Sequence, residues 1–516
     1  MKRFFALVLA LVMTLSLAAC GGQSGETTSE DDASQGSEGG YQELVVIGSN
    51  GQIITDDPQA QSNVTHAYMF QCTHEKLTYW NWDTESLEPG LATSWDWRDD
   101  TTLEVKLDTT TTFHNGEKLT AEDVVYSFER IREMYPGNAG TIAAVTEFVA
   151  ESDDTVLFKM DAHLSDLPSI FSSGVYYIVN KKACTEDPEH GAAIGTGPYM
   201  IEEVVPSEVA HLVAYEDFRD GTPKTPRIDI TYVAETSARL ISLQTGEIDV
   251  CIQPNNNELD LVREDPNLQL IERDSPTHAT LIFNTQSEVF SDVNARLAVA
   301  YALSQEDIIT VAVEGYGEIA ANYWAPQTFG YTDEYSYDGV HVYGQDLEKA
   351  KEYAEKAGLT SFHIAVSTTE RAKMAQAIQA MMAEIDVEVI VDNMETAAIN
   401  NAMAWDNPQG FEAGIYNSTW AVHGDSCRSK FYPEQSGNRA HLVDERVIEL
   451  IDKAAVEPDE AKRIEMYHEI QKMNTEQCWY YPMFLNKFFA AAKAGVEGVI
   501  WSNSNSHDFK GIYIEK

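Results

Sequence analysis

The sequence predicts an α/β protein with more than one domain, and three observations lead to this fold class. The chain of 516 residues is too long for one compact core. Its 43% hydrophobic and 10% aromatic residues allow most of it to fold as a globular protein. After Asp346, helical and extended patterns alternate with short links, which is typical of an α/β layer with a largely parallel sheet.

The first half of the chain opens on a buried strand, expected at 43–48. Apolar and polar residues then alternate over 101–108, which predicts a half-buried strand. Asn115-Gly116 indicates a turn. Thr120 follows as an expected N-cap with Asp123 three residues later, so an amphipathic helix should begin there.

The second half contains the alternation itself. The expected elements, in order, are a helix at 346–357 stopped by Gly358, a strand at 362–366, a helix at 371–384, a strand at 387–391, helices at 445–455 and 459–475, and an apolar extended stretch at 479–492.

The first nineteen residues have the pattern of an export signal. Lys2 and Arg3 form a cationic start, and residues 4–19 are an apolar run that is short for a membrane span. The run ends in Leu-Ala-Ala-Cys-Gly at 17–21, which resembles a bacterial lipobox. The resemblance implies that the Cys20 thiol receives a lipid and becomes the first residue after cleavage.

Residues 20–40 are expected to form the lipidated cysteine and a tether. The segment contains no aromatic residue and no aliphatic one larger than Ala33, so it cannot bury itself. A Gly/Ser-rich coil of this length reaches roughly 25 Å. It would hold a globular body near a membrane without fixing the orientation of that body.

The charge balance excludes one class of partner. With 35 Lys+Arg against 83 Asp+Glu, the formal net charge is −48. Such a surface repels phosphate backbones, so we expect no nucleic-acid binding. No G-x-S-x-G, P-loop, H-E-x-x-H or EF-hand pattern occurs, and we expect no cofactor or metal site.

The cysteines beyond Cys20 are five in number and widely spaced, without a C-x-x-C pair. Buried free thiols are the default expectation for them, and one long-range disulfide stays open.

Five motifs occur in order along nearly the whole mature chain. They are LEPGLATSW at 87–95, FHNG with LTAEDVVYS at 113–127, GTGPY at 195–199, LQTGEID at 243–249, and FNT with the Asp292, Arg296 and Tyr301 pattern at 283–302. Together they resemble family 5 of the extracellular solute-binding proteins, the oligopeptide-, dipeptide- and nickel-binding components of ABC importers. The motifs are mostly helix starts and turns, so they identify the fold and leave the ligand open.

The resemblance implies a two-lobed, periplasmic-binding-protein-like (type II) fold with an extra domain inserted in the first lobe. The first lobe would combine 41–70, 195–282 and 490–516, the inserted domain would be 71–194, and the second lobe 283–489. Hinges are expected near Phe283–Asn284 and Asn486–Phe489. The resemblance also implies that the chain captures a small solute between its lobes without turnover and delivers it to permease subunits. We expect a monomer that is held to the membrane only by its lipid.

The segment 414–425 carries most information about the ligand. In the peptide-binding branch of the family, a Trp here is followed three residues later by an Asp that receives the α-ammonium group of the peptide. In this chain the Trp is Trp420, but His423 occupies the later position and the nearest carboxylate is Asp425. A neutral imidazole supplies no compensating charge. Either Asp425 takes this role, or free peptide amino termini are not bound.

Asn417 to Trp420 also resemble the nickel branch of the family, and His423 would suit a metal as a nitrogen donor. The Pro-Tyr-Asp-Pro continuation of that branch is missing. A peptide or peptide-like solute therefore ranks first and a chelated metal second, with opines and sugars after them. A secreted lipoprotein hydrolase and a surface adhesin or sensor are the alternatives of other classes.

Four other residues are candidate ligand contacts. Asn50 follows the first strand, where ligands bind in α/β folds. Tyr68 lies on the first expected helix, and Tyr323-Trp324 lie in a loop of the second lobe. Trp80 and Trp82 are expected in the core of the inserted domain.

Overall fold

The computed structural model describes residues 40–60, 64–82, 84, 86–136, 139–172, 174–334, 344–501 and 507–516. The expected signal segment, Cys20 and the tether up to residue 39 lie outside the described residues. Within the described part of the chain, no helix has both the length and the apolar character that crossing a membrane requires.

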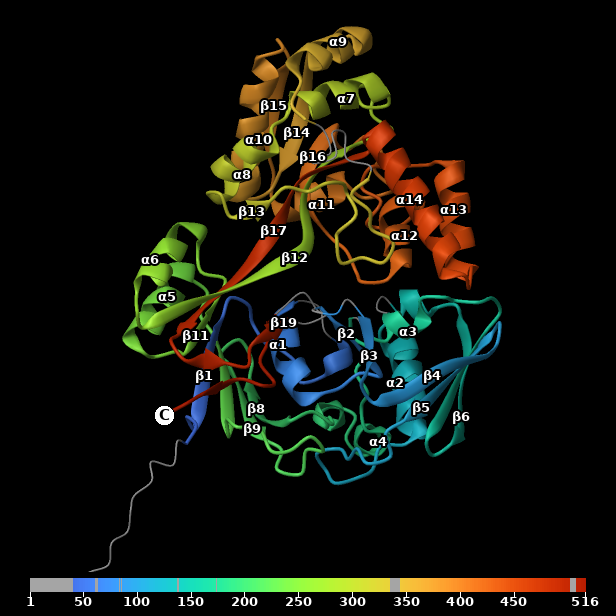
Figure 1. Ribbon diagram of the computed structural model, residues 1–516, viewed down its shortest axis with the longest axis vertical. Coiled ribbons are helices and arrows are strands. Elements are labelled where there is room, and N and C mark those ends of the chain that lie inside the picture. The colour runs from blue at the N-terminus through green and yellow to red at the C-terminus, as the bar shows by residue number, and fades with distance from the viewer. Residues whose placement is uncertain are drawn as a thin grey trace, which may run out of the picture. The chain divides into compact units, whose positions relative to one another are not determined.

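A mixed sheet of eleven strands runs through the described residues (Figure 1). Its strands, in spatial order, are β15 (Glu388–Asn393), β14 (Ser361–Val366), β16 (Ala413–Thr419), β12 (Leu268–Phe283), β17 (Tyr480–Lys493), β11 (Val250–Ile252), β1 (Leu44–Ser49), β10 (Arg227–Tyr232), β9 (Val209–Ala214) and β8 (Tyr199–Val205), with β13 (Gly317–Glu318) beside β17. The strands expected at 43–48, 362–366, 387–391 and 479–492 are confirmed as β1, β14, β15 and β17.

The long strands β12 and β17 connect the two ends of this sheet (Figure 1). Their antiparallel ladder has a register shift between Asp274 and His278. Before the shift β17 also pairs with β11, and after it β12 also pairs with β16. An interrupted ladder lets a strand pair bend. The shift lies ahead of the crossover expected at Phe283–Asn284, and Phe283 is itself buried and paired with Ala413.

The expectation of a largely parallel sheet is wrong for the sheet as a whole. Only β15-β14-β16 and β11-β1-β10 are parallel sections among the described strands. The other pairings are antiparallel. The helix–strand alternation after Asp346 indicates the parallel section correctly, but long strands that connect distant segments leave no such local pattern.

A separate antiparallel sheet has four strands. Its strands, in spatial order, are β4 (Ala92–Asp99), β5 (Thr102–Leu107), β7 (Thr155–Met160) and β6 (Val145–Ser152). Helix α2 (Ala121–Met134) packs on it through Phe128, whose ring centroid lies 5.2 Å from that of Phe158. β5 is the strand expected at 101–108. This sheet lies within the predicted inserted domain, whose boundaries stay a prediction.

The remaining elements complete the fold. The other helices are α1 (Val64–Thr73), α3 (Leu167–Ile170), α4 (Lys181–Glu186), α5 (Thr236–Thr245), α6 (Leu259–Glu264), α7 (Val293–Ala302), α8 (Gln305–Val313), α9 (Leu347–Ala357), α10 (Thr369–Ala383), α11 (Thr396–Ala402), α12 (Arg428–Phe431), α13 (Glu445–Val456) and α14 (Glu460–Gln477). The short strands are β2 (Thr78–Asn81) with β3 (Ser86–Pro89), β18 (Val496–Glu497) with β21 (Tyr513–Ile514), and β19 (Ile500–Trp501) with β20 (His507–Asp508). The helices expected in the second half are confirmed as α9, α10, α13 and α14.

The sequence signals at helix ends act as expected. Thr120 is the N-cap of α2, and both its backbone N–H and its hydroxyl donate to the Asp123 carboxylate, at 3.0 and 2.9 Å. Gly358 ends α9 in the left-handed region, at φ 64°. Such conformations favour glycine because it lacks a Cβ atom.

The two glycines of the GTGPY motif serve close packing. Neither Gly195 nor Gly197 has a positive φ, so neither serves a left-handed turn. Instead a Cβ at Gly195 would lie 2.0 Å from the carbonyl oxygen of Thr73, and one at Gly197 would lie 2.6 Å from that of Cys72. Close packing against the end of α1 therefore requires both glycines.

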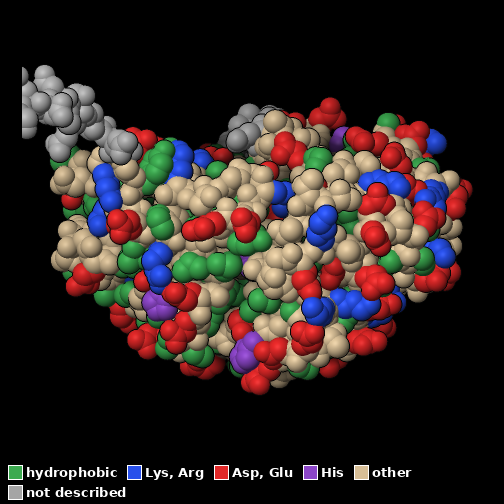
Figure 2. Space-filling model, turned by 90° about the horizontal axis from the view of Figure 1, so that it is seen from below, with side chains coloured by type: hydrophobic (Ala, Val, Ile, Leu, Met, Phe, Trp, Pro, Cys, Tyr) green, Lys and Arg blue, Asp and Glu red, His purple; other side chains and the backbone are tan. Residues whose placement is uncertain are grey.

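The five cysteines of the described body are buried, and no disulfide links them to one another. They are Cys72, Cys184, Cys251, Cys427 and Cys478. Acidic side chains cover much of the surface that Figure 2 shows, in agreement with the negative net charge.

Candidate functional site

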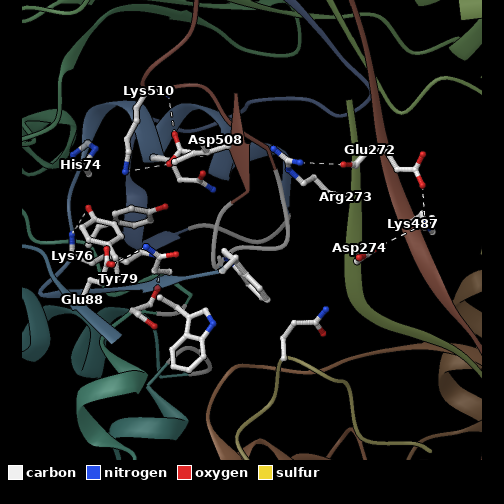
Figure 3. Close-up of a pocket in the computed structure, with 18 of the residues that line it drawn as sticks. His74, Lys76, Tyr79, Glu88, Glu272, Arg273, Asp274, Lys487, Asp508 and Lys510 are labelled. Atoms are coloured by element: carbon white, nitrogen blue, oxygen red, sulfur yellow. Dashed lines mark hydrogen bonds and ion pairs between the residues drawn. The ribbon is translucent and has the colours of Figure 1, made fainter. Parts of the chain in front are cut away.

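A cavity of about 790 Å³ lies between the start of β2 and the β12–β17 strand pair (Figure 3). This volume is in the range of small-ligand sites in proteins. Charged and aromatic side chains make up most of its wall. They include Lys76, Tyr79, Trp80, Trp82, Glu88, Tyr177, Glu272, Arg273, Asp274, Glu318, Lys487, Asp508 and Lys510.

One wall of the cavity is formed by residues at and just before β2, and it contains a buried cation, Lys76. This residue is only 3% exposed. Its Nζ donates to the Ser172 carbonyl at 3.1 Å and lies 4.6 Å from the centroid of the Tyr177 ring. Among the described residues, no carboxylate is within ion-pairing distance of it. Burial lowers the pKa of Lys76 to about 7, while Asp508 raises it and Lys510 lowers it further.

Trp80 and Trp82 belong to the same wall and correct the expectation that they are core residues. Both are half-buried and line the cavity. Neither indole Nε1 has a hydrogen-bond acceptor in the described structure. Because indole is only a donor, these two groups are available to an acceptor from a ligand.

A segment near the C-terminus supplies a paired charge to the same wall. Lys510 Nζ lies 3.4 Å from the Asp508 carboxylate and 4.8 Å from the centroid of the Tyr79 ring. The Asp508 charge raises the pKa of Lys510, so this lysine stays protonated.

The opposite wall is formed by the bending strand pair and is rich in carboxylates. Lys487 Nζ lies 2.8 Å from Glu272, 3.0 Å from Glu318 and 3.6 Å from Asp274. Burial disfavours the charge of Lys487, but the bonds to Glu272 and Glu318 raise its pKa above the usual value. Arg273 is exposed beside them, donates to the Glu272 carbonyl at 3.4 Å, and has no carboxylate within ion-pairing distance among the described residues.

Three of the sequence-predicted contacts form an aromatic cluster away from this cavity. Tyr323, Trp324 and Trp420 are 2%, 1% and 1% exposed. The ring centroids of Trp324 and Trp420 are 4.4 Å apart, and Tyr323 stacks on Tyr480 at 4.5 Å. The structure thus brings these residues together, but as packed core. Their contact with a ligand stays a prediction.

The two predicted polar residues of the loop also lie outside the cavity wall. His423 is buried, which lowers its pKa, and its Nδ1 lies 4.0 Å from Asp166. The Asp425 carboxylate accepts from Arg428 Nε at 3.2 Å. Burial raises the pKa of Asp425 to about 6, against the opposing charge of Arg428. Asp425 already has a cationic partner, so its proposed role with a ligand ammonium stays untested.

The last two predicted residues are placed as follows. Asn50 is exposed after β1, and its side-chain amide donates to Gln253 at 2.5 Å. Tyr68 is on α1, as expected, and packs in the core with its ring centroid 5.8 Å from that of Phe509. Neither lines the cavity described above.

The charged residues of the cavity wall were therefore not predicted from the sequence. One local signal was present, because Lys76 lies three residues before the aromatic run Tyr79 to Trp82 and a lysine is rarely buried without a partner. The grouping of Glu272, Glu318 and Lys487 had no such signal, since three distant segments supply them. No group of three or more His, Cys, Asp or Glu in the described structure is arranged to hold a metal ion.

Comparison with known proteins identifies the family of this chain. The profile of the bacterial extracellular solute-binding proteins, family 5 Middle, matches residues 86–433. The chain belongs to this family. It is therefore an extracytoplasmic solute-binding protein, and the α/β periplasmic-binding-protein fold implied by its motifs is confirmed.

Individual relatives are distant but cover most of the chain. The haem-binding protein A of Haemophilus influenzae is 25% identical over 100% of this chain and 100% of that protein. The dipeptide-binding protein of Escherichia coli is 24% identical over 86% of this chain and 89% of that protein. The crystal structure of the ABC transporter substrate-binding protein CtaP from Listeria monocytogenes superposes with a TM-score of 0.83, at 22% identity, over 92% of this chain and 100% of that one.

Proposed function

We propose that this protein captures a peptide or peptide-like solute in the cavity between β2 and the β12–β17 pair, and delivers it to the permease of an ABC importer. The observation that carries the proposal is the composition of the cavity wall. It combines aromatic surfaces with separate cations and carboxylates. A short peptide presents an anionic end, a cationic end and apolar side chains, and so matches this combination.

The cavity wall favours a peptide over the other solutes of the family. The walls carry fixed charges of both signs, which an uncharged sugar does not need. The dipeptide-binding relative supports the same class, while the haem-binding relative shows that family members differ in ligand.

The finer parts of the function follow from the chain's N-terminal pattern and from the family. Cys20 would carry a lipid and hold a monomeric body outside the cell membrane through the 20–40 tether. Binding would shift an open–closed equilibrium toward a form that the permease subunits recognise, with no chemical turnover.

Mass spectrometry of the ligand that co-purifies with the native protein tests the proposal. We expect unmodified short peptides, which are recovered intact after incubation with the purified protein. Recovery of a metal chelate, an opine or a sugar instead would overturn the peptide assignment. Progressive cleavage of added peptides with turnover would show a hydrolase.

A further inference from the structure

The cavity wall contains a buried cation, Lys76, that forms no ion pair among the described residues. Lys76 is 3% exposed, and the polar contact that its Nζ makes is with the neutral Ser172 carbonyl. A buried charge without a counter-charge destabilises a fold unless something else compensates it. Since Lys76 lines a cavity of about 790 Å³, a ligand anion can reach the same wall.

Two further donors without acceptors lie in the same wall. The Nε1 groups of Trp80 and Trp82 have no partner in the described structure. Ammonium and indole groups donate hydrogen bonds and accept none. The Glu88 and Asp508 carboxylates of this wall already have partners in Asn81 and Lys510. A ligand carboxylate can therefore meet Lys76 and the two indole N–H groups, because it accepts several hydrogen bonds and carries the charge opposite to that of Lys76.

The facing wall has the opposite imbalance. Glu272, Asp274 and Glu318 surround the single ammonium group of Lys487. Figure 3 shows Glu272, Asp274 and Lys487 across the cavity from Lys76. Arg273 also lies on this side, and Glu272 has a second cation in Arg263, at 3.4 Å. Among the described residues, Asp274 and Glu318 have Lys487 as their shared cation. A cationic group of a ligand is therefore favoured here.

We propose that the cavity binds its solute in one direction, with the solute carboxylate against Lys76 and the two indole N–H groups, and its ammonium group against Asp274 and Glu318. This inference rests on the proposed peptide function and adds the direction in which the peptide lies in the cavity. It assigns the ammonium group to the bending strand pair and β13 rather than to the loop of Asp425, whose carboxylate already accepts from Arg428.

A library of mixed-sequence di- to pentapeptides, made in four forms, tests this polarity. The forms are the free peptides, the C-terminal amides, the N-acetyl peptides and the doubly blocked peptides. After removal of endogenous ligand, binding is measured by calorimetry and by mass spectrometry of the retained peptides. We expect the free form to bind best, because it alone has both charges.

Variants then assign each end of the peptide. Lys76→Met should weaken binding of the free peptides by about 10- to 100-fold, as expected for loss of a hydrogen bond to a charged group, and should hardly change binding of the amides. Asp274→Asn with Glu318→Gln should weaken the free peptides and spare the N-acetyl forms. Asp425→Asn should change neither.

Lys430→Met is the matched control for Lys76→Met. Lys430 is also buried, at 8% exposed, and its Nζ lies 4.8 Å from the centroid of the Trp420 ring, but it does not line the cavity. We expect its removal to leave peptide binding unchanged. Melting temperatures of all variants separate a binding defect from a folding defect.

The outcomes separate this inference from the proposed function. If none of the four forms binds, the peptide function itself is wrong, and the inference with it. If free peptides bind but Lys76→Met weakens acids and amides equally, or Asp425→Asn or Lys430→Met weakens the free form, the peptide function stands and the polarity is wrong.

Discussion

Asp166 and Arg463 form a buried ion pair, in which Arg463 Nη1 donates to Asp166 Oδ1 at 2.8 Å. Their side chains are 5% and 10% exposed. Asp166 is the N-cap residue of α3, a helix that shares its hydrophobic core with the four-stranded sheet. Arg463 is on α14, which packs with the aromatic cluster. The backbone N–H of Asp425 also donates to Asp166, at 2.8 Å. The pair therefore joins two separately packed parts of the molecule.

Loss of this pair should favour separation of the two parts. Asp166→Asn leaves the Arg463 charge buried without its partner, which costs about 3–5 kcal/mol in the joined form. We expect a larger radius of gyration in small-angle scattering and weaker peptide binding. Asp161→Asn, at an exposed position on the same segment, is the control. An unchanged radius and affinity would contradict a role for the pair in closure.

Peptide binding should weaken as the pH rises through about 7. Burial lowers the pKa of Lys76 to about 7, so above this pH the side chain loses the charge that we assign to a ligand carboxylate. The other titratable groups of this wall are His74, Tyr79, Glu88, Tyr177, Asp508 and Lys510. Of these, Asp508 and Lys510 shift the pKa of Lys76 in opposite directions. Calorimetry with free peptides between pH 6 and pH 8.5 checks this, at roughly tenfold per pH unit at most. The same series with Lys76→Met should fall less, because there the main group that titrates in this range is the α-ammonium group of the peptide, with a pKa of about 7.7–8.0.

In the ligand-free protein, Lys76 should make the free energy of unfolding rise with pH. Its pKa is lower in the folded than in the unfolded chain, so above pH about 7 the unfolded state binds more protons. The contribution of Lys76 to the free energy of unfolding therefore rises with pH until the unfolded lysine also titrates. Urea unfolding of the wild type and of Lys76→Met at pH 6 and pH 9 should show a smaller rise in the variant. An equal rise in both would contradict the lowered pKa.

Two tryptophans should separate stability from binding. Trp420→Ala removes a side chain that is packed against Trp324 at 4.4 Å, and should lower the free energy of unfolding by about 3–5 kcal/mol. Trp82→Ala, at a half-buried position in the cavity wall, should lower it much less and weaken peptide binding instead. Urea denaturation and calorimetry on both variants check this contrast. Normal stability with lost binding in Trp420→Ala would return that residue to the ligand site.

Membrane attachment should depend on one atom of the chain, the sulfur of Cys20. Cys20→Ser removes the expected lipid acceptor. We expect the variant in the soluble extracytoplasmic fraction after cell fractionation, while the wild type stays with the membranes. A variant that stays in the membrane fraction would show that the lipobox interpretation is wrong.

Local patterns predicted local structure well in this chain. The Thr120 and Asp123 spacing predicted the start of α2, and Gly358 predicted the end of α9, because caps depend on a few neighbouring residues. The reason for Gly195 was not predictable in the same way. A glycine is needed there because the backbone of Thr73, more than one hundred residues away in the chain, approaches Gly195 closely.

The site was less predictable than the fold, for the same physical reason. The contacts predicted from the family's binding loop, Trp420 and Asp425, lie in aromatic packing and in an ion pair with Arg428, and their contact with a ligand stays a prediction. The charges of the cavity wall come from segments as distant as Lys76 and Lys487, and only the folded sheet brings them together. A charged residue on a bending strand also resembles any solvent-facing strand residue in the sequence.

The register shift between Asp274 and His278 begins at a residue that lines the cavity. A solute that touches Asp274 or Lys487 contacts these two strands directly, and the proposed open–closed equilibrium would change their curvature. Solute binding and strand curvature are then coupled. Binding changes the equilibrium between two curvatures by the same factor by which the curvature changes the affinity for the solute. A substitution that stiffens residues 275–277 would alter affinity without touching the solute, and the bound solute would in turn stiffen these strands.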